Sequence, residues 1–126
     1  MKKVFVLLCL GLNFVLCSCN LGENKIISEI ALENGDKKVI IFSRDVGATA
    51  GLSTHISIVK KSHRLSNGEK GNVCVFINKE RDIFLNKDYF IEWETNKQLL
   101  IKLKSDLVVF KKEGVLKNIR IVYSFL

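Results

Sequence analysis

The chain has 126 residues, of which 48% are hydrophobic and 26% charged, with eight glycines, four cysteines and no proline. This length suits one ordinary domain and is too short for two, and the apolar fraction excludes a disordered chain. No segment repeats at a fixed period, which excludes collagen-like and solenoid folds. The 20 basic residues exceed the 13 acidic ones, but they form no long run and have no interleaved aromatic residues, so we expect no nucleic-acid partner.

The first residues have the layout of a secretory signal peptide. A basic head, Met1-Lys2-Lys3, precedes an apolar run, residues 4–16, that only Gly11 and Asn13 interrupt. Small residues and cysteines follow at once, as they do before a cleavage site. Because a helix needs about 20 apolar residues to cross a bilayer, this run is too short to span a membrane and predicts export.

The segment Leu16-Cys17-Ser18-Cys19 resembles the lipobox of bacterial lipoproteins, in which an aliphatic residue and two small residues precede the lipid-modified cysteine. The resemblance implies fatty acyl chains, such as palmitate, on Cys19 and a location at a membrane of the bacterial cell envelope, facing the periplasm or the exterior. Cys17 is the rival acceptor, but it would place bulky Leu16 at the cleavage point. Two alternatives stay open: a secretory signal that leaves Cys19 as a free thiol, and an uncleaved anchor.

The chain is expected to divide into a signal peptide over 1–18, a lipidated cysteine with a short tether over 19–25, and a single domain over 26–126. Loss of the signal removes Lys2 and Lys3, so the net charge falls from +7 to +5. It also leaves Cys74 as the one cysteine of the domain, which excludes an internal disulfide. Since Cys74 lies in the apolar run 72–77, we expect a buried, unreactive thiol.

Beyond the tether the sequence predicts β-strands throughout. Two apolar runs, 26–32 and 37–43, flank Asn34-Gly35, a dipeptide that favours the tight turn of a β-hairpin. Residues 53–58 alternate, with isoleucines on a face that we expect to be core and with serines and a histidine on the other. Residues 62–72 are predicted to form a polar loop.

The second half continues this pattern, with strands predicted at 72–77, 89–94, 98–104, 107–112 and 116–124. The second and third of these should form a hairpin across Thr95-Asn96-Lys97, and the last two should pair around Glu113-Gly114. About eight short strands and no helix predict an all-β fold, a small antiparallel β-sandwich or barrel. We expect most of the large aromatic residues in its core, namely Phe42, Phe76, Phe84, Phe90, Trp93, Phe110, Tyr123 and Phe125.

Residues 44–58 follow the pattern R-D-x-G-A-T-x-G-x-S-T-x-I-S-I. The pattern is similar to that of a family of small bacterial membrane-associated or lipoprotein domains of unknown function, and the resemblance covers about residues 38–124. It implies a fold and a location and assigns no catalytic residue. Val46 departs from the family, in which this position is often a cysteine.

The same segment is the candidate ligand or partner loop. Gly47 and Gly51 permit backbone conformations closed to other residues, so the loop between them can expose amide N–H groups to an anion or a partner. The alternative is a plain connection whose polar side chains bond buried backbone groups. The candidate residues are Arg44, Asp45, Gly47, Thr49, Gly51, Ser53 and His55.

No catalytic or metal-binding pattern accompanies these residues. Asp45, Ser53 and His55 are the residue types of a hydrolytic triad, but the segment lacks the G-x-S-x-G turn that presents such a serine. His55 and His63 are the only histidines, and neither has the spacing of a metal site. We therefore expect no metal and no cofactor, and we assign no catalytic residue.

Together these patterns favour a lipid-anchored envelope protein that acts as a binding or assembly module, with the membrane as one partner and an envelope protein as another. Two alternatives stay open. One is an envelope hydrolase that uses polar residues of segment 44–57. The other is an inhibitory or immunity-type lipoprotein that blocks a partner through an exposed strand edge.

Overall fold

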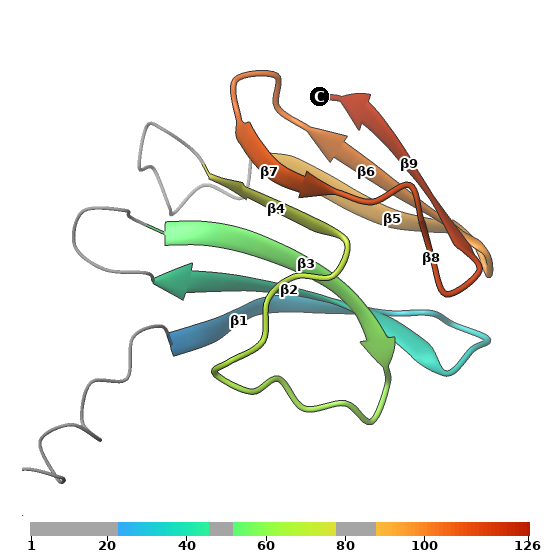
Figure 1. Ribbon diagram of the computed structural model, residues 1–126. Helices are drawn as coiled ribbons and strands as arrows, with labels where there is room; N and C mark the ends of the chain where they lie inside the picture. The colour runs from blue at the N-terminus through green and yellow to red at the C-terminus, as the bar shows by residue number, and fades with distance from the viewer. Residues whose placement is uncertain (1–22, 46–51, 78–87) are drawn as a thin grey trace, which may run out of the picture.

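The computed structural model describes residues 23–45, 52–77 and 88–126, which form two β-sheets packed face to face (Figure 1). The strands are β1 (Glu23–Ala31), β2 (Lys37–Asp45), β3 (Leu52–Lys60), β4 (Cys74–Ile77), β5 (Tyr89–Thr95), β6 (Gln98–Leu103), β7 (Val108–Lys112), β8 (Val115–Leu116) and β9 (Ile119–Phe125). The predicted all-β sandwich is confirmed. These ranges contain no helix, and so none long and apolar enough to cross a membrane. The predicted signal peptide, Cys19 and residues 20–22 lie outside the described residues.

The five-stranded sheet has the order β1-β2-β3-β4-β7, with every neighbouring pair antiparallel. The predicted first hairpin is confirmed, because β1 pairs with β2 and the Leu32 N–H donates to the Lys37 carbonyl (3.0 Å) at the turn. β1 begins at Glu23, in residues that we expected in the tether. Residues 23–25 form strand here because they pair with the end of β2.

The four-stranded sheet has the order β5-β6-β9-β8. The predicted hairpin of β5 and β6 is confirmed, but the predicted pairing of residues 107–112 with 116–124 is wrong. β7 pairs with β4 in the other sheet, while β9 runs parallel to β6. The reason is a tight turn inside the segment predicted as one strand: Lys117 and Asn118 have φ values of 51° and 67°, the left-handed conformation of a type I′ turn. This turn pairs β8 with β9, so the chain changes sheets near Glu113-Gly114.

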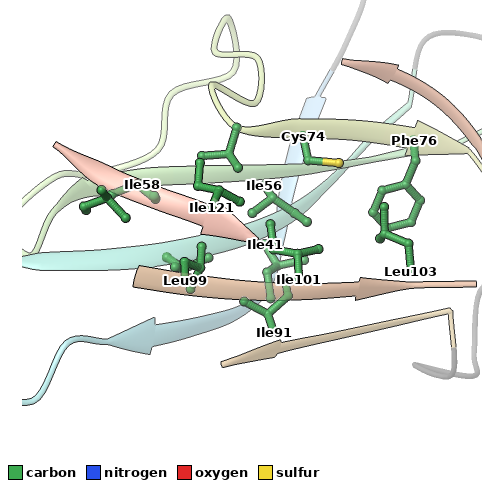
Figure 2. Packing of buried hydrophobic residues seen from close by; sticks show 13 residues of the cluster. Ile41, Ile56, Ile58, Cys74, Phe76, Ile91, Leu99, Ile101, Leu103 and Ile121 are labelled. Carbon is green, nitrogen blue, oxygen red and sulfur yellow. The ribbon is translucent and has the colours of Figure 1, made fainter. Parts of the chain in front are cut away.

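The main core lies between the two sheets. Figure 2 shows Ile41, Ile56 and Ile58 of the five-stranded sheet packed with Leu99 and Ile101 of the four-stranded sheet. All five side chains are at most 1% exposed. Since successive residues of a strand point to opposite faces, the isoleucine face of β3 is the one that the alternation predicted for the core.

Cys74 lies in the same cluster and is fully buried as a free thiol. Burial in apolar surroundings raises the pKa of this thiol to about 11. The predicted burial of this thiol is confirmed, and a thiol that is protonated at neutral pH is expected to be a weak nucleophile.

The prediction that most large aromatic residues lie in the core is wrong. Phe42 and Phe76 are buried, and Trp93 and Tyr123 are partly buried. Phe90, Phe110 and Phe125 are exposed. The first two of these lie on edge strands of the described sheets, and Phe125 lies at the end of β9. Phe84 lies outside the described residues.

Trp93 connects the two sheets, because its Nε1–H on β5 donates to the Ile30 carbonyl on β1 (3.1 Å). Trp93→Phe is expected to lower the free energy of unfolding by about 1–2 kcal/mol, since it removes this hydrogen bond and part of the buried ring. The matched control is Tyr89→Phe on the same strand, whose hydroxyl has no hydrogen-bond partner among the described residues. Urea denaturation of both variants should separate them, and an equal loss in the two would contradict the proposed link.

Candidate functional site

Both faces of β2 and β3 are buried, because the connection between β3 and β4 returns along the face that points away from the main core (Figure 1). We call this connection, residues 61–73, the covering loop. Its Leu65 packs against Ile40, Phe42 and Val59, which form a second apolar cluster. The polar face of β3 is therefore interior rather than solvated.

Three polar side chains of β3 lie on this interior face. Ser53, His55 and Ser57 are only 8%, 4% and 3% exposed. A buried polar group without a hydrogen bond is costly. No buried side-chain nitrogen or oxygen in the described part of the chain lacks a partner.

Arg44 and Asn24 hold the covering loop at the start of β1. The two residues are cross-strand neighbours, and Arg44 Nη1 donates to Asn24 Oδ1 (3.2 Å). Arg44 Nη1 also donates to the carbonyls of Asn67 (2.9 Å) and Glu69 (3.1 Å). Asn24 Nδ2 donates to the carbonyls of Ser66 (2.7 Å) and Glu69 (2.8 Å). The guanidinium of Arg44 thus binds loop carbonyls, which lack a strand partner.

A second fastening lies at the other end of the loop. Asn72 Oδ1 accepts from the Ile58 N–H (2.9 Å), and Asn72 Nδ2 donates to the Ile58 carbonyl (3.0 Å). The Asn72 side chain thus takes the place of a neighbouring strand. Its backbone N–H donates to the Ser57 hydroxyl (3.1 Å).

Within the covering loop, His63 Nε2 contacts both carboxylate oxygens of Glu69 (2.8 and 2.9 Å). The Ser66 N–H and hydroxyl donate to the same carboxylate (3.3 and 3.2 Å). Burial by itself raises the pKa of Glu69, but these hydrogen bonds outweigh it and the pKa is lowered. His63 is therefore an internal partner of the loop and is only partly exposed.

His55 lies at the centre of the network, stacked on Phe42 with 5.1 Å between ring centroids. The Gly71 N–H donates to His55 Nδ1 (2.9 Å). A backbone N–H can only donate, so Nδ1 is unprotonated and the ring proton of neutral His55 is on Nε2. Burial, followed by the positive charges of Arg44 and Lys70, lowers the pKa of His55 to about 4, so the ring is neutral at pH 7.

This tautomer decides what Ser53 and His55 can do together. His55 Nε2 lies 2.8 Å from Ser53 Oγ and donates its proton to it, while the Ser53 hydroxyl donates to the Arg44 carbonyl (3.3 Å). A general base needs an unprotonated nitrogen facing the nucleophile. In a hydrolytic triad a carboxylate orients the histidine, whereas here the backbone N–H of Gly71 does so. The arrangement fixes the covering loop and does not activate Ser53.

Of the seven candidate residues, the structure brings three together. Arg44 and Ser53 are cross-strand partners, and His55 contacts Ser53. Asp45 is the exposed last residue of β2. Gly47, Thr49 and Gly51 lie outside the described residues. Sequence reasoning missed Asn24, which it placed in the tether, although the residue lies in β1. It also missed Glu69, Gly71 and Asn72, whose one signal was their place in the predicted polar loop.

Beside this network lies a hollow of about 350 Å³, which we call the basic hollow. It lies at the end of β3, where the covering loop and the β8–β9 turn meet. The residues that line it include Ser57, Lys60, His63, Glu69, Lys70 and Lys117. No group of three or more His, Cys, Asp and Glu side chains gathers to hold a metal in residues 23–45, 52–77 and 88–126. The charge of the hollow is positive, which suits an anionic ligand.

Comparisons with known proteins leave this site without a relative. No protein-family model matches the chain, and no curated protein or solved structure matches it. The resemblance of segment 44–58 to a family of bacterial envelope domains stays a prediction.

Proposed function

We propose that this protein is a lipid-anchored component of the bacterial cell envelope and that its β-sandwich acts as a binding or assembly module. The N-terminal pattern carries this proposal. A basic head and a short apolar run end at Leu16-Cys17-Ser18-Cys19, and a packed domain begins at Glu23. Acylation of Cys19 with two or three chains would hold the protein at a bilayer durably, whereas a single chain binds only marginally.

The network around His55 supports a binding role in preference to hydrolysis. Its polar groups are used to fasten the covering loop to the sheet at Asn24, Arg44 and Asn72. A loop held in one conformation loses little entropy on association, and such preorganisation favours affinity.

A short tether would also orient the domain. Residues 20–22 separate Cys19 from β1, and an extended chain spans at most about 3.6 Å per residue, so Glu23 would lie within roughly 15 Å of the acylated cysteine. Glu23 pairs with Asp45, and Asp45 pairs with Leu52. The starts of β1 and β3 would therefore face the membrane, and the end of β3 would face away from it.

Cys19→Ser is expected to abolish acylation and the membrane retention that depends on it. The parent protein, extracted from membranes, should have the mass of residues 19–126 plus acyl chains, and the variant should lack the acyl mass. Intact-mass spectrometry combined with membrane fractionation measures both. Cys17→Ser is the matched control and should keep lipid and location. A parent chain without added mass would contradict the proposal. Loss of the lipid in Cys17→Ser while Cys19→Ser keeps it would contradict the proposal as well.

A further inference from the structure

We propose that the basic hollow is a binding site for a phosphate-bearing ligand that approaches from the side of the domain remote from the tether. This inference deepens the binding role and rests on the proposed function for the location of the site in the envelope. The chemistry of the site itself follows from charge, shape and hydrogen bonding within the described residues.

Three lysines of the hollow have no acidic partner among the described residues. The ion pairs within residues 23–45, 52–77 and 88–126 are Lys38–Glu29, His63–Glu69 and Lys104–Asp106, so none of them involves Lys60, Lys70 or Lys117. Glu69, the one carboxylate of the described residues that lines the hollow, is held by His63 and Ser66. Three lysines therefore line one small space, and no carboxylate of the described residues forms an ion pair with them.

The strand register places a further lysine, which does not itself line the hollow, beside Lys60. Lys37 on β2 lies directly opposite Lys60 on β3, and Lys37 Nζ donates to the Lys117 carbonyl (3.5 Å). Like charges directly opposite each other destabilise an antiparallel pair. An anion bound between these side chains would remove the repulsion between Lys37 and Lys60. The charge arrangement is therefore one that a bound anion would stabilise.

One uncharged donor and the size of the hollow suit a compact oxyanion. The Ser57 hydroxyl accepts from the Asn72 N–H, which leaves its own proton for a ligand, since the described residues offer it no acceptor. Lysine ammonium groups bind phosphate as point charges and need no fixed angle. A volume of about 350 Å³ is at the lower end of the range of small-molecule sites.

The position of the hollow indicates the source of the ligand. Leu52 lies at the tether end of the sheet, and Lys60 lies eight residues further along β3, or about 26 Å at 3.3 Å per residue. Figure 1 shows β1 beginning at one side of the sheet and the arrowhead of β3 at the other. This separation from the tether favours a soluble phosphorylated ligand over a headgroup of the anchoring bilayer.

The test is a titration with inorganic pyrophosphate of the full lipidated chain, anchored in neutral phosphatidylcholine vesicles. We expect saturable binding that weakens with salt and falls at least about tenfold when Lys60, Lys70 and Lys117 are all changed to glutamine, since each charged hydrogen bond is worth about one order of magnitude. The matched control changes Lys25, Lys97 and Lys111 to glutamine. These three lysines are exposed and do not line the hollow, and their replacement removes the same total charge as the hollow variant does. Thermal midpoints check folding, and pyrophosphate should raise that of the parent and the control.

Each remaining outcome decides a separate point. No saturable binding by the parent, or an equal loss in both triple variants, overturns the site. If the parent protein links its own vesicles to added phosphatidylglycerol vesicles and the hollow variant does not, the ligand is a lipid. That result overturns the soluble ligand and assigns the site to a facing membrane. If Cys19 carries no lipid while the chain added to these vesicles still binds pyrophosphate through the three lysines, the envelope proposal fails and the anion site stands.

Discussion

Gly71→Ala is expected to destabilise the domain by about 3 kcal/mol, because the new methyl group has no space. A Cβ at this position would lie 2.9 Å from the Cys74 carbonyl oxygen and 3.0 Å from the Ile56 nitrogen. Both atoms belong to the backbone where β3 and β4 pair, so they cannot move aside as the end of a flexible side chain could. The substitution would also displace the N–H that donates to His55 Nδ1.

Gly68→Ala, in the same covering loop, is the matched control. No atom lies within 4 Å of a Cβ built at Gly68, so this change should alter the free energy of unfolding by less than about 0.5 kcal/mol. Urea denaturation measures both variants. A Gly71→Ala protein as stable as Gly68→Ala would show that the covering loop does not pack against β3 and β4 in this way.

Acidification is expected to remove about 3 kcal/mol of stability between pH 7 and pH 4 through His55. Burial and the charges of Arg44 and Lys70 lower the pKa of this ring from 6.5 to about 4 in the folded chain. Between these values the unfolded chain binds a proton that the folded chain does not bind, so stability rises with pH. The contribution is fully present above pH 6.5 and is lost as the pH falls toward 4. The cost follows from 1.36 kcal/mol per unit of pKa difference.

Urea denaturation at several pH values tests this linkage. His55→Gln should be less stable than the parent at pH 7, since the Phe42 stack is lost. Between pH 6.5 and 4.5, the slope of its free energy of unfolding against pH should be smaller than that of the parent by the equivalent of about one proton. His63→Gln keeps His55 and should keep that slope. If His55→Gln and the parent showed equal slopes, the neutral, buried state of His55 would be wrong.

Gly71, His55 and Ser53 are linked by one chain of hydrogen bonds. Gly71 supplies the N–H that fixes the His55 tautomer, and His55 in turn supplies the donor for Ser53. Their effects on stability should therefore be less than additive when Gly71→Ala and His55→Gln are combined, because each removes the same hydrogen bond.

Local sequence patterns determined the positions of the β-strands and the pairing of some of those that form hairpins. The alternation of residues 53–58 predicted Ile56 and Ile58 in the core, and Asn34-Gly35 predicted the hairpin of β1 and β2; both are confirmed. The apolar run around Cys74 predicted a buried thiol, which is also confirmed. These features depend on contacts close in sequence or on the two-residue period of a strand, which the sequence displays directly.

Tertiary structure alone decided what covers each face and which strands meet. Alternation shows that a strand has two faces, but the burial of Ser53 and His55 depends on where the covering loop returns, and the parallel pairing of β6 with β9 depends on a chain reversal at Lys117 and Asn118. The basic hollow likewise joins Lys60 and Lys70 to Lys117, which lies on the other sheet's turn. Such associations between distant segments follow from the packing of the whole chain, because the entropy cost of closing long loops is recovered only when all the layers assemble.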